Sequence, residues 1–229
     1  MWLQFRLNRQ IAKARRALIK TPNPVLSEYL NALPRRFDQP LSQSQILALD
    51  LELTGLDAKR HQIVSLGYVA TDNLSIALGT AHQHLIQVAG SVGDSAIIHH
   101  LTDADLAAAQ PLSEAMNQLV AAMCGRVLLC HHAPLDAAFL QQAFVSCFGT
   151  RLPLLVIDTQ QIEKRRQERT APNVPLHRLR LHHCRQHYGL PLSSGHQALG
   201  DAIACAELLM AQQAHQTSVS RLADVVQLA

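Results

Sequence analysis

The 229-residue chain is 48% hydrophobic and 16% charged, a composition that supports one substantial core and excludes extensive disorder. Its formal net charge of +3 conceals a basic arm, because residues 1–40 hold eight basic and two acidic residues, a net of +6, against −3 for the rest. There is no apolar stretch of membrane-spanning length, no signal peptide with a proper apolar segment, and no Cys-x-x-Cys spacing among the five cysteines, so we expect a cytoplasmic protein.

Residues 1–43 are expected to form a basic helical extension. Apolar and basic residues recur there as two stripes at helical spacing, which predicts an amphipathic helix, with a second short helix near 25–33. The apolar stripe consists of Leu3, Leu7, Ile11, Ala14 and Leu18, and the basic stripe of Arg6, Arg9, Lys13, Arg16 and Lys20. We favour docking of this helix on the protein's own domain or on a partner. Three alternatives stay open: the helix could bind nucleic-acid phosphates, lie on an anionic membrane surface or serve as an organellar presequence.

The rest of the chain is most economically interpreted as a single α/β domain over residues 44–214, followed by a tail helix within 215–229. Strands are predicted near 45–52, 61–71, 75–88, 126–130 and 154–158, the first three as a meander. Helices are predicted near 102–108, 112–124, 134–147, 159–169, 176–188, 196–214 and 219–228.

Two acids stand at the end of the first predicted strand. Asp50 and Glu52 follow the apolar run 46–49, and side chains at i and i+2 of a strand point to the same face, so two negative charges are forced together. Hard divalent cations such as Mg²⁺ and Mn²⁺ are held by carboxylate oxygens, which makes this pair a candidate half of a metal site. The alternative is an acid that is merely solvated at a strand end.

Two more acids and a histidine lie at later helix starts. Asp136 falls in the opening turns of the helix near 134–147, and Asp201 follows His196 by five residues. Histidine can take a proton from metal-activated water near neutral pH, and we expect His196 to precede the helix on a mobile loop. Taken singly, Asp136 could be a first-turn acid favoured by the helix dipole, Asp201 an exposed helix residue and His196 a capping residue.

Three blocks of the sequence resemble the DEDDh-type 3′-5′ exonuclease family, which includes the proofreading exonuclease subunit of bacterial DNA polymerase III, ribonuclease T and oligoribonuclease. The blocks are Asp50-Leu51-Glu52-Leu53-Thr54-Gly55, His131-His132-Ala133-Pro134-Leu135-Asp136-Ala137-Ala138-Phe139-Leu140 and His196-Gln197-Ala198-Leu199-Gly200-Asp201-Ala202. Their order and spacing agree with the family over about residues 44–214, and three ordered blocks are more specific than any one alone.

The resemblance implies a ribonuclease-H-like α/β fold, with a central mixed sheet flanked by helices. It implies two divalent ions, Mg²⁺ or Mn²⁺, bound by Asp50, Glu52, Asp136 and Asp201, with His196 as the general base. These five residues form the expected catalytic set.

The resemblance also concerns the substrate. It implies that the loop formed by Leu53, Thr54, Gly55 and Leu56 binds the terminal nucleotide, with Leu56 against the base. The implied reaction removes nucleotides from the 3′ ends of single-stranded DNA or RNA and releases nucleoside 5′-monophosphates. A DNA polymerase subunit is a candidate partner.

Some positions leave alternatives open. Most relatives carry asparagine where this chain has His132 and phenylalanine where it has Leu135, so the substrate contact expected of His132 is in question. Asp158, at a strand end, is interpreted as a helix N-cap, and the basic residues within 164–187 are either a cationic wall for phosphates or a solvated helix face.

Two alternative functions remain. One is a non-catalytic nucleic-acid-binding or polymerase-docking module on the same fold. The other is a short-RNA-specific oligoribonuclease. Sugar preference, substrate length and oligomeric state are not determined by the sequence.

Overall fold

The computed structural model describes residues 2–88, 109–169, 173–192, 197–216 and 220–229. At its centre lies one mixed sheet with the strand order β3-β2-β1-β5-β6-β7, in which β4 also pairs with β2. The strands are β1 (Gln45–Leu53), β2 (Ile63–Asp72), β3 (Ser75–Ile76), β4 (His82–Leu85), β5 (Val127–Cys130), β6 (Leu155–Asp158) and β7 (Val226–Leu228). β1 runs antiparallel to β2 and parallel to β5, which confirms the expected mixed sheet. The helix expected near 102–108 lies outside the described residues.

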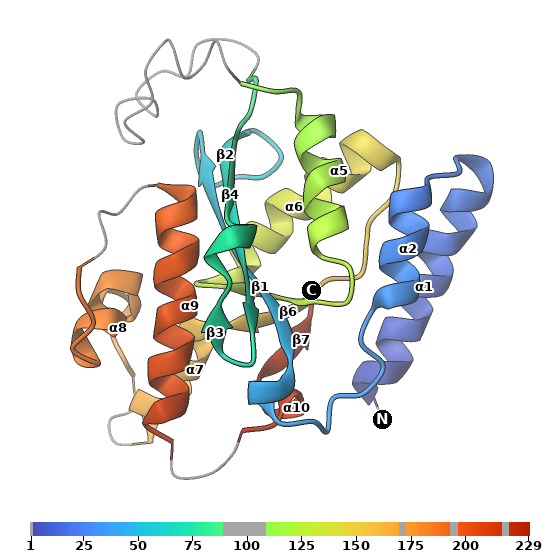
Figure 1. The fold of residues 1–229 in the computed structure, drawn as a ribbon. Coiled ribbons are helices and arrows are strands. Elements are labelled where there is room, and N and C mark those ends of the chain that lie inside the picture. The colour runs from blue at the N-terminus through green and yellow to red at the C-terminus, as the bar shows by residue number, and fades with distance from the viewer. Residues whose placement is uncertain (1, 89–108, 170–172, 193–196, 217–219) are drawn as a thin grey trace.

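Helices lie on both sides of this sheet (Figure 1). On one side α9 (Ala198–Ala214) packs against β1 and β2, with α7 (Thr159–Glu168) and α8 (Leu181–His187) beside it. On the other side lie α5 (Leu112–Ala122), α6 (Ala133–Phe148) and the N-terminal helices α1 (Trp2–Lys20) and α2 (Pro24–Ala32). Because both faces are covered, β1 and β2 are nearly continuous buried runs. In the part of the chain that the structure describes, no helix is both long and apolar enough to cross a bilayer.

The two N-terminal helices share one hydrophobic core with the sheet. The buried residues of α1 are Leu7, Ile11, Ala14 and Leu18. α2 starts at Pro24, after Asn23, whose side chain accepts a hydrogen bond from the Leu26 N–H at 3.2 Å, a favoured helix start. The Tyr29 hydroxyl of α2 donates to the Pro153 carbonyl at 2.6 Å. Docking of the apolar stripe on the protein's own core is therefore confirmed, while the division of the chain into parts at residues 43 and 214 stays a prediction.

The predictions of a strand near 75–88 and of a tail helix near 219–228 are both wrong in detail. A 3-10 turn, Leu78–Thr80, separates β3 from β4, and the Thr80 hydroxyl accepts the Ala70 N–H of β2 at 2.9 Å in place of a strand carbonyl. The tail forms only the short α10 (Leu222–Val225) and then β7, which pairs antiparallel with β6. The β-branched residue Val226 and the free ladder groups of β6 favour a strand there.

The region expected as one helix near 176–188 is also divided. It consists of a 3-10 turn, Leu176–Leu179, followed by α8. Arg180 lies between them in an extended conformation, which interrupts the helical hydrogen bonding.

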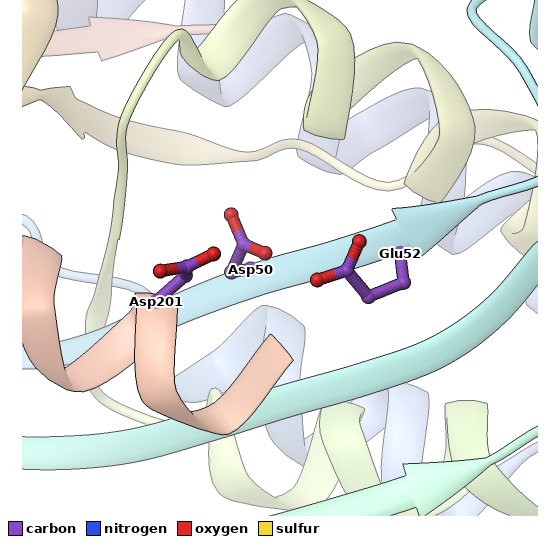
Figure 2. A group of neighbouring side chains, drawn as sticks. All are labelled: Asp50, Glu52 and Asp201. Atoms are coloured by element: carbon purple, nitrogen blue, oxygen red, sulfur yellow. The ribbon is translucent and has the colours of Figure 1, made fainter. Parts of the chain in front are cut away.

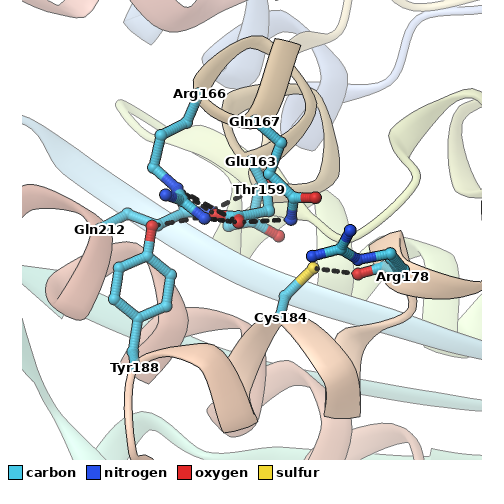
Figure 3. Close-up of polar contacts among 8 residues, drawn as sticks. All are labelled: Thr159, Glu163, Arg166, Gln167, Arg178, Cys184, Tyr188 and Gln212. Carbon is cyan, nitrogen blue, oxygen red and sulfur yellow. Dashed lines mark hydrogen bonds and ion pairs between the residues drawn. The ribbon is translucent and has the colours of Figure 1, made fainter. Parts of the chain in front are cut away.

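A buried polar network fixes α7 against α8 and α9 (Figure 3). The fully buried Glu163 carboxylate of α7 accepts hydrogen bonds from Arg166 at 2.5 Å, Gln167 at 2.8 Å and Tyr188 at 2.9 Å. Burial by itself would raise the pKa of Glu163, but these hydrogen bonds together lower it. The Gln212 side chain of α9 donates to the Thr159 carbonyl of α7 at 3.0 Å, so the two helices are also joined directly.

Two of the basic residues within 164–187 are used inside the protein. Besides Arg166, the nearly buried Arg185 is used inside the protein, where it donates to the Ala204 carbonyl at 2.7 Å and pairs with Glu207 at 2.7 Å. These two arginines hold helices together. A cationic wall for phosphates would have to be built from the other basic residues of the segment.

Candidate active site

Three carboxylates converge where β1 meets the start of α9 (Figure 2). One oxygen from each of Asp50, Glu52 and Asp201 lies within 4.8 Å of the others. β1 carries the first two at positions i and i+2, and Asp201 lies in the first turn of α9. Among the described residues this is the one group of three or more acidic, histidine or cysteine side chains that could hold a metal ion.

Glycine at position 67 allows the backbone of α9 to lie close against β2. Gly67 of β2 lies directly across the ladder from Asp50. A Cβ atom at Gly67 would lie 2.1 Å from the Leu199 nitrogen and 2.2 Å from the Ala198 carbonyl carbon, both in the backbone of α9. Asp201 is two residues further along that helix. We infer that Gly67 sets the separation between the strand-borne and helix-borne carboxylates.

This position was missed in the sequence, although a signal was present. A glycine inside a strand pattern indicates a bulge or a close approach of another backbone. Gly67 interrupts the apolar run of β2 in this way.

The electrostatics of the group are those of crowded acids. Desolvation raises the pKa of Asp50 well above its usual range, and the negative charges of Asp136 and Glu52 add to the effect. Hard divalent cations offset repulsion of this kind and prefer carboxylate oxygens. The donor set of Asp50, Glu52 and Asp201 therefore fits Mg²⁺ or Mn²⁺.

Asp136, the fourth predicted ligand, is close to this group but not in it. It lies buried in the first turn of α6, and desolvation, with the charges of Asp158 and Glu52, raises its pKa to about 8. α6 begins directly after β5, the strand next to β1. Asp136 thus acts electrostatically on the three-carboxylate group, and its role as a ligand stays a prediction.

Asp158 is an N-cap, as predicted, and it joins two helix starts. Its carboxylate accepts the Gln160 N–H of α7 at 2.9 Å. It also accepts the His132 and Ala133 N–H groups at 3.1 Å each, at the start of α6. Hydrogen bonds to Asp158, at the end of β6, therefore hold the start of α6, the helix that carries Asp136.

His132 occupies a left-handed backbone conformation, with φ of 73°. Asparagine and histidine are among the few non-glycine residues enriched there, which gives a physical reason why histidine can replace the family's asparagine. The His132 ring contacts the Gln160 side-chain oxygen at 2.9 Å. Its contact with substrate stays a prediction.

The loop after β1 is closed by its own hydrogen bonds. The Thr54 hydroxyl accepts the Gln62 N–H at 2.9 Å. A Cβ at Gly55 would lie 2.5 Å from the His61 ring, so glycine lets that ring cover the loop. Leu56 is 78% exposed, while Leu53 is buried in β1. Leu56 is thus free to meet a ligand, and nucleotide binding by the loop stays a prediction.

His196, the predicted general base, lies outside the described residues. α9 begins at Ala198, with Gln197 as its N-cap. The helix that carries Asp201 therefore starts two positions after the histidine.

Comparison with known proteins decides the family. Residues 47–209 match the RNase T family, which is described as exonuclease. The chain belongs to this exonuclease family. The match covers most of β1 and α9 and includes Asp50, Glu52 and Asp201, and it confirms the resemblance to DEDDh-type exonucleases. Members of this nuclease family generally use divalent metals.

One curated relative and several solved structures agree with the assignment. The DNA polymerase III subunit epsilon of Treponema pallidum is 28% identical over 168 residues, which are 73% of this chain and 76% of that protein. Escherichia coli exonuclease I in complex with a dT13 oligonucleotide is similar with a TM-score of 0.61 at 13% identity, over 73% of this chain and 40% of that one. Exonuclease I from Methylocaldum szegediense gives 0.62 at 14% identity, over 76% and 41%. The chain thus spans about two fifths of these solved exonucleases, and the likeness shows that the fold is ribonuclease-H-like.

Proposed function

We propose that this member of the exonuclease family is a metal-dependent 3′-5′ exonuclease that acts on single-stranded DNA or RNA ends and releases nucleoside 5′-monophosphates. The observation that carries the proposal is the convergence of Asp50, Glu52 and Asp201 within 4.8 Å. Two divalent cations, when bound, supply charge stabilisation to the attacking and leaving oxygens of phosphodiester hydrolysis. Asp50, Glu52 and Asp201 would hold them, with Asp136 as the fourth ligand.

The remaining roles concern protons and substrate. His196 would accept the proton of the attacking water, for which a pKa near neutrality suits it. Thr54 and Gly55 would bind the terminal nucleotide beside the carboxylates, together with Leu53, and the exposed Leu56 would contact its base. His132 would stand where relatives use asparagine, so we expect the substrate preference to differ from theirs.

The partners follow from the same reasoning. The relative from Treponema pallidum is named as a DNA polymerase III subunit, and the Escherichia coli exonuclease I structure holds an oligonucleotide. We therefore propose single-stranded nucleic acid as substrate and a DNA polymerase subunit as a partner. All five cysteines are free, which supports a reducing, cytoplasmic location.

The test is degradation of matched DNA and RNA oligonucleotides labelled at either end, in Mg²⁺ or Mn²⁺ and in chelator. A 5′ label should appear in a ladder of shortened products, and a 3′ label in mononucleotide from the first cleavage. Asp50→Ala and Asp201→Ala should abolish both signals. Near wild-type rates in these variants, or rates unaffected by chelator, would refute the proposal.

The same assay separates the alternatives. Binding without divalent-dependent product release would indicate a non-catalytic module. Activity confined to the shortest RNA substrates would indicate an oligoribonuclease.

A further inference from the structure

The outer face of α1 carries charge and aromatic rings that the packing of the protein does not use. We define this face by Trp2, Phe5, Arg6, Arg9, Lys13, Arg16 and Lys20. The inward side of the helix is buried in the core, whereas Trp2 is 71% and Phe5 67% exposed. α1 contains no acidic residue. The helix therefore keeps a second, exposed and basic side after its apolar stripe has docked.

The cations of this face have no carboxylate partner among the residues that the structure describes. Among the described residues, arginines elsewhere pair with carboxylates, as Arg126 does with Asp72 at 2.6 Å and Arg166 with Glu163. None of the five cations of the outer face forms such a pair in the described part of the chain. The Arg6 guanidinium instead lies over the Trp2 ring, 4.7 Å from its centre.

We propose that the outer face of α1 binds single-stranded nucleic acid at a site separate from the carboxylate group. Its cations are spaced three or four residues apart, so they form a row about 21 Å long from Arg6 to Lys20. Such a row matches the repeated phosphates of a backbone. Trp2 and Phe5, at one end of the row, are exposed aromatic side chains, the kind of group against which bases stack.

An anionic membrane is the other polyanionic partner, and the packing disfavours it. A helix that lies in a membrane interface inserts its apolar face below the headgroups. In α1 that face, which includes Leu7 and Ile11, is buried against the protein's own core. What remains outside is a charged row with two rings at one end and Ile19 at the other, which suits a strand of phosphates and bases better.

The outer face lies away from the proposed active site. α1 is on the opposite side of the sheet from α9, the helix that carries Asp201 (Figure 1). Binding there would hold a nucleic acid by a part distant from the end being degraded. The proposal therefore goes beyond the proposed hydrolysis and does not depend on metal or turnover.

Fluorescence offers a direct test, because Trp2 is the single tryptophan of the chain. The full chain is titrated with a polythymidine oligonucleotide in chelator, where no hydrolysis occurs, while Trp2 emission and oligonucleotide anisotropy are followed at several salt concentrations. We expect Trp2 emission to be quenched in step with the anisotropy. Quenching of Trp2, which lies on the opposite side of the sheet from α9, separates this site from the proposed catalysis.

A matched pair of variants locates the phosphate contacts. Arg9→Gln with Arg16→Gln removes two charges from the outer face and should weaken binding on the order of tenfold, with the slope of log affinity against log salt reduced by about 1.4. Arg35→Gln with Arg36→Gln removes two exposed charges from the loop after α2 and should leave both quantities unchanged.

Three results would overturn the proposal. The first is equal affinity and salt slope in the two double variants. The second is saturated oligonucleotide binding without any change in Trp2 emission. The third is tighter binding, with a shift of Trp2 emission, to phosphatidylserine vesicles than to the oligonucleotide, which would assign the face to a membrane surface.

Discussion

Gly67 is the residue whose substitution tests the geometry of the site most sharply without changing any carboxylate. In Gly67→Ala the new methyl group would lie 2.1 Å from the Leu199 nitrogen, whereas ordinary contact begins at 3.4 Å. The backbone of α9 would have to retreat by about 1.3 Å, taking Asp201 away from Asp50. The obstacle is main chain in a packed helix, so no side-chain rotation relieves it.

The expected magnitudes follow from the size of this displacement. Overpacking of a well-filled interior costs typically about 1–3 kcal/mol, and a shift of about 1 Å in a catalytic group can cost about 100-fold in rate. We therefore expect Gly67→Ala to unfold with a free energy lower by about 1–3 kcal/mol. Its rate of metal-dependent oligonucleotide degradation should be about 100-fold lower.

Urea unfolding and the end-label assay measure the two effects on the same preparations. Gly79→Ala is the matched control, because nothing lies within 4 Å of a Cβ at that exposed glycine. A folded Gly67→Ala protein that loses activity supports the role of the glycine in spacing the carboxylates. If Gly67→Ala equals Gly79→Ala in both stability and rate, the reasoning is wrong.

Three further predictions concern stability. In the folded protein the pKa of Asp136 is raised to about 8 and that of Asp50 is also raised, so both carboxyls keep their protons at pH values where the unfolded chain has released them. Metal-free protein should therefore lose stability as the pH rises from about 4 towards 8. Asp50→Asn should flatten this dependence and abolish stabilisation by Mn²⁺. Arg166→Met should lower the free energy of unfolding by about 1–3 kcal/mol, because it leaves the buried Glu163 without its charged donor. This deficit should shrink below about pH 4. The native hydrogen bonds lower the pKa of Glu163, and their contribution to stability is lost when the carboxylate is protonated. Leu7→Ala should cost about 2–5 kcal/mol because Leu7 is fully buried in the core, whereas Ile19→Ala, at a side chain 80% exposed, should change stability by about 0.5 kcal/mol or less.

Urea unfolding at several pH values, with and without Mn²⁺, checks all three. A metal-free stability that rises between pH 4 and 8 would contradict the first prediction. A pH-independent deficit in Arg166→Met would contradict the second. Equal losses in Leu7→Ala and Ile19→Ala would show that α1 does not contribute to the core.

The parts of the fold that depend on local patterns could be predicted from the sequence. Asp50 and Glu52 share a face of β1 because strand geometry requires it. Asp158 caps α7 because a carboxylate at a strand end meets free N–H groups. The inward stripe of α1 followed from helical periodicity.

Features that depend on distant neighbours could not be predicted in this way. β7 forms because β6 offers an unpaired edge, which no periodicity within the tail reveals. Gly67 matters because of the α9 backbone, more than 130 residues later in the chain. The distance of Asp136, on α6, from the other three acids is likewise set by tertiary packing, and its role as fourth ligand stays a prediction.

The central claim is that Asp50, Glu52 and Asp201 form a binding site for divalent cations. The most direct measurement is anomalous X-ray scattering from crystals of the protein soaked in Mn²⁺. We predict anomalous peaks in contact with the oxygens of these three residues, as a pair about 3.5–4 Å apart. Manganese peaks only at other residues, or none at this group under saturating Mn²⁺, would contradict the account.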